Sequence, residues 1–79
     1  MEEKMCRLNE LAPGQRGRIQ RVASAEDMKQ RLLNMGFTHG AHIECVYRSP
    51  LGDPTAYFIK GTLVAVREED AGRIWIIRE

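Results

Sequence analysis

Glycine and proline interrupt this chain so often that only one segment is long enough for an amphipathic helix. The breaks fall at Pro13-Gly14, Gly17, Gly36, Gly40, Pro50, Gly52, Pro54, Gly61 and Gly72. Most segments between them have the length of a short β-strand. A chain of 79 residues has room for one core, so we expect a single domain over residues 1–79. The pattern predicts a mostly β fold in which five short strands close into a small barrel.

The one predicted helix lies between the first two strands, at about residues 24–35. Ser24 can accept a hydrogen bond from the unpaired N–H groups of a first helical turn, and Gly36 suits the left-handed conformation that ends a helix. The apolar stripe of this helix consists of Ala25, Met28, Leu32 and Met35. These residues recur every three or four positions, so we expect the stripe to face the core.

The predicted strands cover residues 16–22, 41–48, 55–59, 62–67 and 74–77. In the second strand, strict alternation places Ile43, Cys45 and Tyr47 on one face, with the core. In the first strand the alternation is imperfect, because Arg21 falls on the same side as Ile19.

Charge and hydropathy exclude several classes of partner. Twelve basic and eleven acidic side chains leave a formal net charge of +1, which gives no long-range attraction to nucleic acid or to an anionic membrane. No apolar run approaches the roughly 18–20 residues that span a bilayer. The first residues include acids where a signal peptide has a basic region. We therefore expect a cytoplasmic protein that neither inserts into a membrane nor binds nucleic acid.

One basic stretch favours the alternative of an RNA-binding barrel. Its members are Arg16, Arg18, Arg21, Lys29 and Arg31. Binding of single-stranded RNA uses aromatic side chains among the basic ones, and this stretch contains none. A solvated charged face is therefore the favoured interpretation.

The sequence contains no catalytic or phosphate-binding motif, so we expect a protein that is not an enzyme and needs no cofactor. His39, His42 and Cys45 recur every three residues and are the candidate ligands of a weak transition-metal site. The geometry of a strand opposes this site, because it points His42 and Cys45 to opposite faces. Cys6 and Cys45 lie far apart in the sequence, and we expect both to be reduced thiols.

Taken in order, these motifs resemble the FeoA family of ferrous iron transport proteins. The resemblance rests on Leu8-Asn9-Glu10-Leu11 with Pro13-Gly14, on Gly17-Arg18-Ile19, on Arg31-Leu32 with Gly36-Phe37, on Pro50-Leu51-Gly52-Asp53-Pro54 and on Val64-Ala65-Val66-Arg67. The most specific of these is the PLGDP loop over residues 50–54. The match runs from Leu8 to about Ile76, which is nearly the whole chain.

The resemblance implies an SH3-like barrel that assists ferrous iron uptake from the cytoplasm. Its implied partner is the Fe(II) membrane transporter, bound through the transporter's cytosolic G-protein portion. The family supplies no established catalytic residues and no established iron ligands. The same barrel occurs as a regulatory domain of iron- or manganese-dependent repressors. A metal-sensing domain that acts with a transcriptional repressor is therefore the alternative function.

Six side chains are the candidates for contact with a partner: Leu33, Phe37, Leu51, Asp53, Trp75 and Ile77. If the alternate isoleucines of the last strand face the core, then Trp75 and Ile77 point outward as a patch for the transporter or for a second copy of the chain. Asp53 has a second interpretation, because an aspartate in a loop shaped by proline and glycine can bond to local backbone N–H groups.

Overall fold

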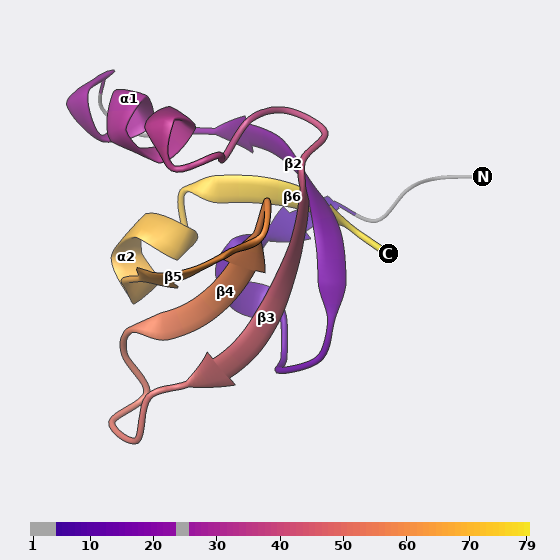
Figure 1. The fold of residues 1–79 in the computed structure, drawn as a ribbon, viewed down its shortest axis with the longest axis vertical. Helices are drawn as coiled ribbons and strands as arrows, with labels where there is room; N and C mark the ends of the chain where they lie inside the picture. Colours follow the sequence, from indigo (N-terminus) through magenta and orange to yellow (C-terminus); the bar gives the residue numbers. More distant parts are fainter. Residues whose placement is uncertain (1–4, 24–25) are drawn as a thin grey trace.

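The structure, a computed structural model, describes residues 5–23 and 26–79. Six strands form one antiparallel sheet in the order β1-β6-β2-β3-β4-β5, which curls around a single core (Figure 1). The strands are β1 (Met5–Arg7), β2 (Arg16–Val22), β3 (His42–Arg48), β4 (Thr55–Ile59), β5 (Thr62–Val66) and β6 (Ile74–Arg78). The helices are the 3₁₀ turn η1 (Leu8–Glu10), α1 (Glu26–Asn34) and α2 (Glu68–Ala71). No helix in these two ranges is long and apolar enough to cross a membrane.

The mostly β architecture is confirmed, but the sheet has six strands rather than the five that we predicted. The additional strand is β1, which pairs with β6 so that Met5 lies opposite Ile77 and Arg7 lies opposite Trp75. A strand of three residues is too short to show an alternation pattern, and the sequence therefore gave no signal that distinguished β1 from the turn that follows it.

The core collects side chains from η1, α1, α2 and the strands β2 to β6. Its fully buried members include Leu8, Leu11, Ile19, Phe37, Ile43, Cys45, Tyr57, Ile59, Ile74 and Ile76. The last two confirm which side of β6 faces inward. The core therefore draws on residues from one end of the described chain to the other.

Helix α1 lies at the periphery of the molecule, at the top left of Figure 1. Gly36 adopts a φ of 100° and stops the helix where the sequence predicted. The predicted cap, Ser24, and the first residue of the predicted stripe, Ala25, lie outside the described residues.

The rest of the predicted helical stripe is only partly correct. Leu32 is buried and Met28 packs against the core, whereas Met35 is 39% exposed. Gly36 turns the chain immediately after Met35, and the next residue, Phe37, is buried instead. The helix thus contributes a shorter apolar face than its sequence period suggested.

A β-bulge in β2 explains the imperfect alternation of that strand. The pairing with β6 shifts register between Ile19 and Arg21. The extra residue turns Arg21 outward while Ile19 and Val22 both remain buried.

A second bulge, in β3, overturns one prediction. The pairing with β4 shifts register between Cys45 and Tyr47, so Tyr47 lies on the outer face and is 53% exposed. We had expected Tyr47 on the core side with Ile43 and Cys45, because simple alternation takes no account of an inserted residue.

Candidate functional site

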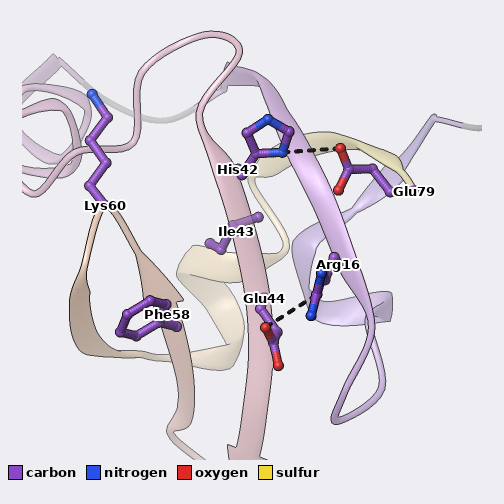
Figure 2. Close-up of a pocket in the computed structure, with 7 residues that line it drawn as sticks. All are labelled: Arg16, His42, Ile43, Glu44, Phe58, Lys60 and Glu79. Atoms are coloured by element: carbon purple, nitrogen blue, oxygen red, sulfur yellow. Dashed lines mark ion pairs between the residues drawn. The ribbon is translucent and has the colours of Figure 1, made fainter.

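A pocket of about 390 Å³ lies on the outer side of β2, β3 and β4 (Figure 2). The sheet register places Arg16 opposite Glu44, and Glu44 opposite Phe58, so these three side chains form a row across three strands. The chain end contributes Glu79, and the β4–β5 turn contributes Lys60. Figure 2 shows the Phe58 ring on one side of the pocket and the two ion pairs on the other.

Some of the charged side chains that line the pocket pair with one another. Arg16 Nε lies 3.3 Å from Glu44 Oε1, and His42 Nδ1 lies 3.0 Å from Glu79 Oε2. Lys60 donates a hydrogen bond from Nζ to Thr38 Oγ1 at 3.0 Å. Ion pairs this exposed contribute at most about 1 kcal/mol to stability. Their effect is instead to orient the polar rim around the exposed aromatic ring.

The pocket continues into an apolar surface on β3, β4 and β5. We call this surface the meander face, and it comprises Val46, Tyr47, Phe58 and Leu63. Phe58 lies directly opposite Leu63 in the sheet, and these side chains are 46% and 53% exposed. Clustered apolar side chains with a polar rim are typical of a protein-binding surface.

Two of the predicted contact residues are buried in the structure. Phe37 is 1% exposed and fills the core after α1. Ile77 is 7% exposed, since its neighbours across the sheet are Met5 on β1 and Arg18 on β2. The unpredicted strand β1 therefore places Met5 beside Ile77, along the edge of β6 that faces away from β2.

The other apolar candidates lie on three different elements. Leu51 is 95% exposed at the tip of the β3–β4 loop, and Leu33 is half-buried on α1. Trp75 is half-buried on β6 between Arg7 and Arg21. Their role as partner contacts stays a prediction, and the structure does not bring them together with the meander face.

Asp53, in the PLGDP loop, accepts a hydrogen bond from the start of helix α2. Its Oδ1 accepts a hydrogen bond from the backbone N–H of Glu68 at 2.9 Å. Glu68 is the first residue of α2, whose own N-cap residue, Arg67, provides no side-chain cap. Asp53 therefore caps α2 from a loop fifteen residues earlier in the chain.

Replacing this carboxylate tests the capping role. We expect Asp53→Ala to lower the free energy of unfolding by about 0.5–2 kcal/mol, because α2 loses an N-terminal acceptor. Chemical denaturation measures the difference. Leu51→Ala, in the same loop but 95% exposed, is the control and should unfold like the parent chain; equal effects of the two variants would contradict the capping role.

The structure does not bring the three candidate metal ligands together at one site. His39 and His42 are exposed, whereas Cys45 is 0% exposed within the core. Burial raises the pKa of the Cys45 thiol, which opposes the thiolate that a metal binds. Within residues 5–23 and 26–79, no three His, Cys, Asp or Glu side chains are grouped to hold a metal ion. Both cysteines in these ranges are free thiols.

Comparison with known proteins places this fold in a family. A family model described as "FeoA domain" matches residues 6–78. The chain is 43% identical over 68 residues to a "Fe(2+) transport protein A/Fe(2+) transporter FeoB fusion protein" of Porphyromonas gingivalis. That match covers 86% of this chain but only 8% of the fusion protein.

Solved structures agree with the family match. The FeoA protein of Chlorobium tepidum superposes with a TM-score of 0.88 at 30% identity, over 92% of this chain and 70% of that one. The FeoA of Stenotrophomonas maltophilia, solved in complex with zinc and described as a procaryotic SH3 domain protein, gives a TM-score of 0.76 at 26% identity. That match covers 94% of this chain and 89% of the other. With its six-stranded SH3-like sheet and a family match over nearly its whole length, the chain belongs to the FeoA domain family.

Proposed function

We propose that this chain is a cytoplasmic binding module of ferrous iron uptake that engages a FeoB-type Fe(II) transporter and performs no catalysis itself. The observation that carries the proposal is the Porphyromonas gingivalis relative, in which a similar sequence is part of one polypeptide with FeoB. A covalent fusion keeps two interacting parts at high effective concentration. An FeoA-type domain that is not covalently joined to FeoB would need a binding surface in place of that link.

The meander face is the surface that we assign to this contact. Phe58 and Tyr47 are large, exposed aromatic side chains, and aromatic residues are enriched at the centre of protein interfaces. The charged rim around Phe58, formed by Arg16, Glu44 and Lys60, supplies polar groups that can fix the orientation of a partner. The finer proposal is that the partner surface belongs to the cytosolic G-protein portion of the transporter.

Calorimetry of the purified chain with that G-protein portion tests the proposal. The titration is run without nucleotide, with GTP, and with GTP together with Fe(II). We expect saturable binding of micromolar strength in at least one nucleotide state, as is common for transient regulatory contacts. Absence of binding in every state would contradict the proposal.

Truncation of one aromatic side chain should weaken this binding. We expect Phe58→Ser to raise the Kd about tenfold or more, because the ring is the largest apolar group beside the pocket. Met5→Ser is the matched control, since Met5 is an exposed apolar residue (56%) on β1, away from the meander face. Equal losses for both variants would exclude the meander face as the specific contact.

A further inference from the structure

The outer side of β1, β6 and β2 carries a second surface, which the sequence alone did not reveal. In the sheet register Trp75 lies opposite Arg7 on one side and opposite Arg21 on the other. The guanidinium carbon of Arg7 lies 5.0 Å from the centroid of the Trp75 ring, and that of Arg21 lies 5.9 Å from it. Both contacts are within the range of a cation–π interaction. We call Arg7, Trp75 and Arg21 the Arg–Trp–Arg ladder.

The two guanidiniums of the ladder have no carboxylate partner within the described parts of the chain. The acid next to Arg7, Glu10, accepts a hydrogen bond from the backbone N–H of Arg7 at 2.7 Å. The side chains of Arg7 and Arg21 are therefore held by the indole ring while their N–H donors remain available. A guanidinium held in this way is pre-organised for an oxyanion.

A hollow of about 330 Å³ adjoins the ladder between α1 and β2. It shares Arg21 with the ladder and adds the basic side chains of Lys29 and His39. Leu33 and Phe37 give it apolar walls, and none of the described residues that line it is acidic. The combined surface is thus cationic with an apolar recess, although the formal net charge of the whole chain is only +1.

The geometry favours one class of occupant over two others. Because β1 and β2 flank β6, the guanidiniums reach Trp75 from opposite sides, which hinders the stacking of a nucleic-acid base on the ring. Lipid surfaces are bound by apolar side chains that protrude, whereas the apolar groups here line a recess. A recess beside fixed guanidiniums suits a peptide that offers carboxylates next to an apolar side chain.

We propose that the Arg–Trp–Arg ladder and the adjoining hollow bind an acidic peptide segment of a partner protein. Carboxylates of the segment pair with Arg7 and Arg21, and an apolar side chain enters the hollow beside Leu33. This surface is separate from the meander face. The proposal of peptide binding therefore does not depend on the proposed contact with the transporter.

The chain contains one tryptophan, Trp75, and its fluorescence therefore reports on this surface alone. The probe is a synthetic peptide in which one leucine is flanked by glutamates on both sides. The control peptide has glutamine in place of every glutamate. We expect the glutamate peptide to shift the Trp75 emission saturably, and the glutamine peptide to bind about tenfold more weakly or worse. Added salt should weaken the binding of the glutamate peptide.

Variants locate the contact on the ladder. Since loss of a guanidinium changes Trp75 emission by itself, variants are compared by calorimetry. The double variant Arg7→Gln with Arg21→Gln should weaken binding of the glutamate peptide about tenfold or more. Arg31→Gln, a matched charge removal elsewhere on the surface, should bind like the parent chain.

Several results would overturn the proposal. One is equal binding of the glutamate and glutamine peptides, and another is no binding of either. These two measurements use the unaltered chain, so they hold even if the double variant fails to fold. A third is an emission shift with vesicles of phosphatidylcholine and phosphatidylserine in equal parts, or with single-stranded oligouridine, but not with the glutamate peptide.

Discussion

Gly17→Val will destabilise the fold by about 3 kcal/mol or more, and Gly17→Ala by about 1–3 kcal/mol. A Cβ atom at this position would lie 2.9 Å from Ile76 Cδ1 and 2.9 Å from the backbone oxygen of Ile77. The isoleucine side chain can move only within a filled core, and the carbonyl belongs to the neighbouring strand β6. Moving either group away from a new Cβ atom costs free energy, because protein interiors are close-packed.

The position of Gly17 explains why the effect should be large. Gly17 lies on β2, where it is paired with Ile43 on β3 and with Arg78 on β6, at the middle of the sheet. Urea denaturation measures the loss, and Thr62→Ala, at an exposed position on the edge strand β5, is the comparison. A Gly17→Ala variant as stable as Thr62→Ala would show that β2 and β6 are not packed as closely as the structure has them.

The stability of the chain will also fall steeply above about pH 10, because of Tyr57. Burial raises the pKa of Tyr57 to about 12, from the ordinary tyrosine value of 10.0. Below about pH 10 the phenol is protonated in both the folded and the unfolded chain, so its contribution to stability is complete. Between about pH 10 and 12 the unfolded chain loses the proton first, and stability falls by about 1.4 kcal/mol per pH unit. The total loss from this group is about 3 kcal/mol.

Tyr57→Phe isolates that contribution from the titration of other groups. The Tyr57 hydroxyl donates a hydrogen bond to the carbonyl oxygen of Leu8 at 3.5 Å, which is long, so the variant should lose little stability at neutral pH. Its free energy of unfolding should decline less than that of the parent chain between about pH 10 and 12. Parallel pH curves for the two proteins would show that Tyr57 is not buried as a neutral phenol.

Much of the fold follows from local sequence signals. Alternation and turn residues located β2, β3, β4, β5 and most of β6, and Gly36 marked the end of α1. The failures have a common cause in the pairing of strands. A strand of three residues, such as β1, is too short to show an alternation of apolar and polar residues. The bulge after Cys45 turns the Tyr47 side chain to the other face of the sheet, and no residue type in the sequence marks that bulge.

The candidate sites were harder to predict, because they are assembled by the sheet from distant segments. The sequence marked Trp75 as unusual, but its neighbours Arg7 and Arg21 are joined to it only by the order β1-β6-β2. Along the chain, no aromatic residue lies among the basic residues of the stretch from Arg16 to Arg31. In the sheet, however, Trp75 of β6 lies opposite Arg21 of that stretch. Phe58 was missed for a related reason, since its exposure depends on which face of β4 the core covers.

The central claim is that the meander face binds a FeoB transporter. The most direct test is a titration of the isotope-labelled chain with the unlabelled cytosolic G-protein portion of that transporter. Nuclear magnetic resonance then reports which backbone amides change environment on binding. We predict that the largest shifts fall on β3, β4 and β5, at and around Tyr47, Phe58 and Leu63. Shifts confined to other elements, or no shifts at a saturating concentration of the partner, would contradict the assignment of the meander face as the transporter-binding surface.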